Sequence, residues 1–197
     1  MTTETYAAER QKARDYLRTR GTLVSVPVIR ERVGAAFEAL EAVLASVPVE
    51  LAARRALPGE WTVQEVVDHL LESNRPGLDE LRCLVAGRRP PGEPIPAGLQ
   101  SKDPGSRPWP WLARELARVH RDILETLDGV APEFTTEARA PLIMVTYARD
   151  AAGGTVPLHW IEDLDWKAYA IVFRLHAIDH MNQIKKTLAA AGAPGAR

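Results

Sequence analysis

The sequence predicts an all-α protein built as an antiparallel four-helix bundle. Four segments carry apolar residues at helical spacing, with charged residues on the faces between them. Capping residues, prolines or glycines mark their ends. Long irregular connections, at about 88–110 and 130–163, leave room for helices that are not sequence neighbours to lie side by side. No internal repeat or second domain is visible, so one domain is expected over residues 1–197, with the bundle at 28–191.

Length and composition are those of an ordinary globular domain. The chain has 197 residues, 46% of them hydrophobic and 26% charged, and a formal net charge of −1. This charge gives no reason to expect nucleic acid or a membrane surface as a partner. No apolar run approaches the roughly 18–20 residues of a membrane span, and the N-terminus lacks the apolar core of a signal peptide. The single cysteine, Cys83, excludes an intramolecular disulfide, so the sequence favours the cytoplasm.

The first third of the chain is expected to supply scaffold. Residues 5–20 hold good helix formers but a thin apolar face, which predicts a short peripheral helix. The first core helix lies between Ser25, a residue type that caps helices, and Pro48, which stops it. Its apolar residues at helical spacing are Ile29, Val33, Phe37, Leu40 and Leu44. None of them can bind a metal or transfer a proton.

The second core helix is predicted to begin at Thr62. Thr62 and Glu65 match a capping box, in which each side chain satisfies a backbone N–H at the helix start. His69 follows about two turns later, beside the apolar stripe. Pro76 is expected to kink or end this helix, although the apolar pattern continues beyond it to about residue 87.

The chain between the second and third helices cannot form a packed element. Seven of the 15 prolines fall in residues 88–110, which predicts a long loop. The third helix is predicted from about Trp111 to Asp128, with His120 at the edge of its apolar stripe.

A small β-hairpin is predicted before the last helix. Two β-rich runs flank Ala152-Gly153-Gly154, and Pro157 would confine the second strand to an edge. The fourth core helix is then predicted to begin near Asp163 or Asp165 and to end around Gly192.

The last helix carries His176 and His180, two of the five histidines, at H-x-x-x-H spacing. Side chains four residues apart lie on one face of a helix. Two such imidazoles can bind one divalent ion at about 2.0–2.1 Å from each nitrogen. The apolar stripe passes through both positions, so both rings are expected to face the core, where a polar group needs a partner. A hydrogen-bonded pair of core histidines is the alternative.

His69, on the inner face of the second helix, supplies a third imidazole. Three protein ligands with an open position are typical of a catalytic metal site, whereas four are typical of a structural one. Cys83 lies 14 residues beyond His69, about 21 Å along a straight helix, so it is not expected to join them. Gln183, one turn beyond His180, is the nearest candidate for a fourth donor, and amides are weak ligands for zinc or nickel.

Two sequence motifs resemble those of the DinB/YfiT superfamily of metal-binding four-helix bundles. These are WTVQEVVDHL at residues 61–70 and HAIDH at residues 176–180, in matching order and helix placement. In that superfamily, a histidine near the start of the second helix and an H-x-x-x-H on the last bundle helix hold a divalent ion, often nickel or zinc. Carried over by position, these ligands are His69, His176 and His180.

The resemblance implies a function in general terms. Members are described as metal-dependent hydrolases, and some are thiol S-transferases or mycothiol-dependent isomerases. It therefore implies a small-molecule substrate, with a low-molecular-weight thiol as a candidate cosubstrate, and a homodimer, since members often form dimers. In an enzyme, the proline-rich loop and the hairpin would enclose a pocket over the open coordination position. The alternative is a non-catalytic bundle that the metal stabilises, acting as a binding or stress-response protein.

Two carboxylates neighbour the candidate ligands in the sequence. Asp68 and Asp179 could each accept a hydrogen bond from an imidazole and orient it, or each could be a solvated surface charge. The sequence does not decide between these two roles. It also leaves open whether His120 or His159 lies near the site.

Overall fold

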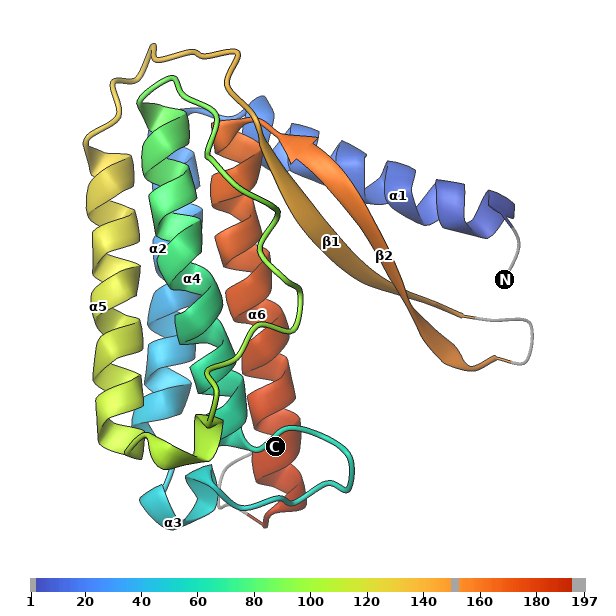
Figure 1. Cartoon of the computed structure of the whole chain (residues 1–197), viewed down its shortest axis with the longest axis vertical. Helices are drawn as coiled ribbons and strands as arrows, with labels where there is room; N and C mark the ends of the chain where they lie inside the picture. The colour runs from blue at the N-terminus through green and yellow to red at the C-terminus, as the bar shows by residue number, and fades with distance from the viewer. Residues whose placement is uncertain (1–2, 150–152, 193–197) are drawn as a thin grey trace.

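The computed structural model describes residues 3–149 and 153–192, and the protein is mostly helical with one two-stranded antiparallel sheet (Figure 1). The longest helices lie side by side, and they are α2 (Val26–Ala45), α4 (Val63–Val85), α5 (Trp109–Asp128) and α6 (Trp166–Ala190). Helices α2 and α4 each pack against both α5 and α6. The two helices that carry the predicted ligands, α4 and α6, are therefore direct neighbours.

Buried aliphatic side chains fill the space between these helices. The five apolar residues predicted to face the core from α2 are each at most 4% exposed. The apolar stripe of α5 is also buried, and it consists of Leu112, Leu116, Val119, Ile123 and Leu127. Burying such side chains is the main favourable term in folding. The predicted inner faces of both helices are confirmed.

The starts of α2 and α4 differ in how their backbone N–H groups are satisfied. The predicted capping box is confirmed: Thr62 Oγ1 accepts from the N–H of Glu65 at 3.1 Å, and Glu65 Oε2 accepts from the N–H of Thr62 at 2.6 Å. Ser25 occupies the N-cap position of α2, but its side chain makes no capping hydrogen bond. The expected cap is wrong in that respect, and a proline in the first turn supplies a backbone angle that suits the helix.

Helix α4 continues through Pro76 to Val85 and does not end there. A proline inside a helix costs roughly 3 kcal/mol. Leu78, Leu81 and Leu84, which follow it, are each at most 4% exposed, and their burial offsets this cost. At Gly77, a Cβ atom would lie 3.1 Å from the ring of Phe173, so glycine lets α4 and α6 approach closely here.

The connections between the long helices contain little regular structure. The proline-rich stretch predicted as a loop runs alongside α4 and contains a 3₁₀ turn, Pro104–Ser106, before α5 begins at Trp109, two residues earlier than predicted (Figure 1). A single turn of helix, α3 (Val49–Ala52), lies between α2 and α4, where the sequence predicted a loop. No helix in the described part of the chain is both long and apolar enough to cross a membrane.

The N-terminal helix, α1 (Thr3–Leu17), continues into a π-helical segment, Arg18–Thr22. At Gly21, within this segment, a Cβ atom would lie only 2.9 Å from the Cα of Ala168. Glycine is therefore needed for this segment to reach the start of α6. The peripheral helix predicted over 5–20 is confirmed, with its first turn slightly earlier.

The predicted hairpin is also confirmed, with strands β1 (Ala140–Arg149) and β2 (Thr155–Leu164). Ala152, at the expected turn, lies outside the described residues. The buried residues of the two strands share one face, and the opposite face leaves Val145, Tyr147 and Ile161 exposed. The hairpin contacts α1, where Tyr6 donates to the carbonyl of His159 at 2.7 Å.

Helix α6 begins directly after the hairpin. Asp165, one of the two predicted start positions, is its N-cap, and its carboxylate accepts from the N–H groups of Lys167 and Ala168. This cap fixes the start of the helix that places His176 and His180 on the face toward α4.

Candidate metal centre

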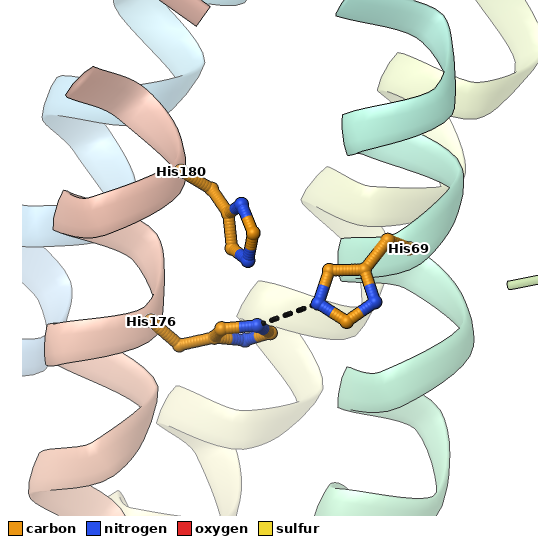
Figure 2. Close-up of side chains that lie close together, drawn as sticks. All are labelled: His69, His176 and His180. Atoms are coloured by element: carbon orange, nitrogen blue, oxygen red, sulfur yellow. Dashed lines mark hydrogen bonds between the residues drawn. The ribbon is translucent and has the colours of Figure 1, made fainter. Parts of the chain in front are cut away.

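The structure brings His69, His176 and His180 together between α4 and α6 (Figure 2). One ring nitrogen from each residue lies within 4.8 Å of those from the other two. His69 Nε2 and His176 Nε2 are 2.9 Å apart, although 107 positions separate these residues in the sequence. We call this group the histidine cluster. In the described part of the chain, no cysteine or carboxylate belongs to it.

The surroundings of the cluster restrict its access to water. His69 is only 2% exposed, while His176 and His180 are partly exposed. The indole of Trp61 lies 5.1 Å from the ring of His69 and 6.3 Å from that of His180, measured between ring centres. Trp61 directly precedes the N-cap of α4, so the capping box also places this aromatic cover beside the cluster.

Hydrogen bonds fix which nitrogen of two of these rings faces inward. His69 Nδ1 lies 2.7 Å from the carbonyl oxygen of Leu99, which can only accept, so Nδ1 carries the proton. His180 Nδ1 lies 2.8 Å from Oε1 of Gln183, and the same reasoning applies. In both residues Nε2 is left with its lone pair toward the cluster. Metal-binding histidines characteristically donate their second ring N–H in this way.

The structure gives Gln183 a different role from the predicted one, and it identifies Leu99 as a further residue that contacts the cluster. The sequence offered Gln183 as the nearest fourth donor, but its amide oxygen accepts from His180 instead. Leu99 contributes through its backbone carbonyl, which no side-chain pattern could have indicated.

Burial keeps the three imidazoles neutral. It lowers the pKa of His69, and it lowers the pKa of His176 well below its ordinary range, with neighbouring histidines adding to the effect. Burial, together with the nearby His69, lowers the pKa of His180 to about 4. Imidazole must be neutral to bind a metal, so the cluster is in its ligand form at neutral pH.

The donor set fits a divalent ion. Nitrogens that are each about 2.1 Å from one ion are at most about 4.2 Å apart. The widest pair, within 4.8 Å, therefore needs only a small side-chain rotation. The hydrogen bond between His69 and His176 requires a proton on one Nε2, so an ion would replace that shared proton. Imidazole ligands suit zinc, nickel and copper better than magnesium or calcium.

A family model agrees with these features. The DinB superfamily model matches residues 33–162, more than half of the chain. The chain belongs to the DinB superfamily. The match includes His69 but ends before α6, so the presence of His176 and His180 in the cluster rests on the structure of this DinB-superfamily protein. No curated protein and no solved structure matches the chain.

Asp68 is buried and positions a loop. It is 0% exposed, so the role of a solvated surface charge is wrong for it. Its carboxylate accepts from the N–H and hydroxyl of Ser101, both at 2.8 Å, and from Arg107 at 3.2 Å. These bonds join α4 to the proline-rich loop that also carries Leu99. Asp68 therefore acts on His69 through the loop, with no hydrogen bond to an imidazole.

The other candidates lie apart from the cluster. Asp179 is exposed and has no hydrogen bond or ion pair within the described residues, so it orients no imidazole, and partial burial of its carboxyl raises its pKa. His159 is exposed on the outer face of the hairpin. His120, predicted at the edge of its helix stripe, is instead 1% exposed. Phe37 of α2 covers its ring, with ring centres 3.8 Å apart.

A pocket of about 410 Å³ lies between α4 and the proline-rich loop. This volume falls in the range of about 300–1,000 Å³ typical of small-molecule sites. Its lining consists of Pro76, Asp79, Glu80, Cys83, Pro90, Pro91, Glu93, Ile95, Pro96 and Leu99. The loop lines this pocket, but none of the three cluster histidines does, so a pocket over the coordination position stays a prediction; Leu99, whose carbonyl accepts from His69, is the lining residue bonded to the cluster. The hairpin contributes no residue to this lining.

Replacing Asp68 by alanine is expected to lower the free energy of unfolding by about 2–4 kcal/mol. The change leaves the N–H of Ser101 without its acceptor, while Arg107 keeps Glu72 as a partner at 2.5 Å. Urea denaturation measures the effect. Asp179→Ala, at an exposed position, is the control and is expected to change stability by less than about 0.5 kcal/mol. Equal effects of the two substitutions would contradict the loop-anchoring role of Asp68.

Proposed function

We propose that this DinB-superfamily protein is a metal-dependent enzyme, a hydrolase or a thiol S-transferase that acts on a small molecule. Its four long helices would form the antiparallel bundle of the DinB/YfiT type. One zinc or nickel ion would be held by His69, His176 and His180. The observation that carries the proposal is the meeting of three neutral, inward-facing imidazoles with no fourth protein donor in the described part of the chain.

The bound ion and the residues of the chain would supply different parts of the proposed catalysis. A bound ion lowers the pKa of a coordinated water or thiol and polarises a carbonyl group. The chain fixes the ligands, since Leu99 and Gln183 hold the rings of His69 and His180. Trp61 limits water on one side of the cluster. The pocket beside Leu99 gives space for a small substrate or a low-molecular-weight thiol.

A non-catalytic role is the second candidate, and the position of the ligands favours it. The cluster joins α4 to α6, two helices that are far apart in the sequence. An ion held there would link these helices and contribute its binding free energy to folding. In this case its coordination would be complete, without a position for a substrate.

Cobalt-substituted protein separates the two functions. We expect its visible absorption spectrum to change when 2-mercaptoethanol is added, while the cobalt content after gel filtration stays at one ion per chain. The thiol then occupies an exchangeable position, as an enzyme requires. The Trp61→Phe variant keeps all three ligands, so it is expected to retain one cobalt ion per chain and serves as the control for an intact metal site. An unresponsive four-coordinate spectrum would contradict the enzyme proposal and favour the structural metal.

A further inference from the structure

The pocket between α4 and the proline-rich loop has acidic side chains on both of its walls. Asp79 and Glu80 line it from α4, and Glu93 lines it from the loop. Among the described residues that line the pocket there is no lysine, arginine or histidine. A molecule in this pocket would meet an excess of negative charge, which attracts a cation and repels an anion. The rest of the described lining consists of four prolines, Ile95, Leu99 and Cys83.

A bond from the neighbouring helix fixes the carboxylate of Glu80. The hydroxyl of Tyr169, on α6, donates to Oε2 of Glu80 at 2.6 Å. Tyr169 is only 3% exposed, and burial together with the nearby Glu80 raises its pKa well above the ordinary value. The hydroxyl therefore keeps its proton and remains a donor. This is the one hydrogen bond of the Glu80 side chain within the described residues, so Oε1 is left to accept from a ligand.

Glu80 also lacks a partner of opposite charge. Neither Glu80 nor Glu93 has an ion pair within the described part of the chain, whereas Asp79 lies 3.3 Å from Arg82 in an exposed pair. Glu80 is partly buried, and this burial raises its pKa. A carboxylate that has lost part of its hydration without gaining a cation is in a less favourable environment than in water. An ammonium group beside Glu80 would supply the missing charge.

The spacing of the carboxylates favours an organic cation over a metal ion. Within the described residues, the histidine cluster is the one group of three or more such side chains close enough together to hold an ion. Calcium takes six to eight oxygen ligands, which the pocket does not gather. An ammonium group on an apolar chain fits better, because it donates hydrogen bonds to one oriented carboxylate. Its chain would pack against the prolines and Ile95.

We propose that this pocket binds a small organic cation, a primary amine with an apolar chain, whose ammonium group is held by Glu80 as oriented by Tyr169. Leu99 lines the pocket, and its carbonyl accepts from His69. Glu80 lies 11 residues beyond His69, about 16 Å along α4. The ammonium group is therefore the end of the molecule remote from the histidine cluster. Its assignment to the substrate rests on the proposed function, whereas its binding does not.

Titration with hexylamine tests the proposal, and hexanoate is the matched probe of opposite charge. The readout is the nitrogen–proton correlation spectrum of the full chain without added metal, so that the amine cannot bind to an ion instead. Hexylamine is expected to shift the amide signals of Glu80, Cys83 and Ile95 until they saturate. Hexanoate is expected to bind at least about tenfold more weakly, because it cannot donate to the carboxylate.

Substitutions in and outside the pocket identify the group that holds the amine. Glu80→Gln keeps an acceptor for Tyr169 but removes the charge, so hexylamine is expected to bind about 10–100-fold more weakly. Tyr169→Phe is expected to weaken binding by about 2–10-fold and to cause no further loss in the Glu80→Gln background, where a general structural effect would still add. Glu133→Gln, at an exposed position outside the pocket, is expected to leave binding unchanged. Thermal unfolding checks that each variant is folded.

Three results would overturn the proposal. They are equal affinity for hexanoate, unchanged hexylamine affinity in Glu80→Gln, and displacement of hexylamine by calcium chloride at matched ionic strength. His176→Ala, which lacks a proposed metal ligand, is expected to bind hexylamine like the unchanged protein, so loss of the metal site leaves this binding measurable. Absence of hexylamine binding in a protein that still binds zinc would overturn the inference and leave the proposed enzyme intact.

Discussion

Replacing His176 by alanine is expected to abolish tight binding of a divalent ion and to leave the helices intact. Loss of an outer partner of a ligand typically weakens metal binding by about 10–100-fold, so loss of a ligand should exceed about 100-fold. The helices are held by the aliphatic core, which this substitution does not remove. Metal content after dialysis and chelator competition measure the first effect, and far-UV circular dichroism measures the second.

The exposed histidine of the hairpin supplies the matched control. His159→Ala also removes one imidazole but is expected to leave metal binding unchanged, because this side chain lies outside the cluster. Quenching of tryptophan fluorescence by cobalt gives an independent readout, since Trp61 lies beside His69 and His180. Full metal content in a protein that lacks both His176 and His180 would show that the ion binds elsewhere.

Local sequence signals predicted those parts of the fold that depend on neighbouring residues. The reciprocal hydrogen bonds of Thr62 and Glu65 involve residues three apart, so the start of α4 could be predicted from four letters. The spacing of His176 and His180 likewise placed both rings on one face of α6 before their partner was known. The proline-rich stretch could form no helix or strand whatever surrounded it.

Contacts between distant segments explain what the sequence did not predict. His120 lies beside the apolar stripe of α5 and is buried, with Phe37 stacked on its ring and Glu41 bonded to it from α2. Pro76 remains within α4 because the buried residues after it offset its cost. The carbonyl of Leu99 is a backbone group, and backbone groups are present at every position. Its role depends on the path of the loop, which Asp68 holds in place.

The metal is expected to remain bound in mildly acidic solution and to be released as the pH approaches 4. An unperturbed imidazole pKa of about 6.5 would predict release already below about pH 6. Burial disfavours the charged ring, and it lowers the pKa of His180 to about 4 and that of His176 well below its ordinary range. Protons therefore compete with the ion only at lower pH. Dialysis against buffers from pH 7 to 4, followed by metal analysis, measures the release.

The same pKa shifts predict how the stability of the metal-free protein depends on pH. The folded protein keeps His180 neutral down to about pH 4, whereas the unfolded chain takes up a proton below about pH 6.5. Between these values the unfolded state binds more protons, so the free energy of unfolding falls as the pH is lowered. For a shift of this size the contribution of one residue is on the order of 3 kcal/mol, complete above about pH 6.5.

Urea denaturation of the metal-free protein at pH 7.5, 6, 5 and 4.5 measures this dependence. His180→Ala is expected to flatten the curve, because the ring that must remain neutral in the folded state has been removed. His159→Ala, which changes an exposed histidine, is expected to keep the full dependence. Stability that stays constant over this range, together with metal release already at pH 6, would mean that the cluster histidines titrate as solvated groups. Water would then reach the ring of His180 despite the cover that Trp61 provides.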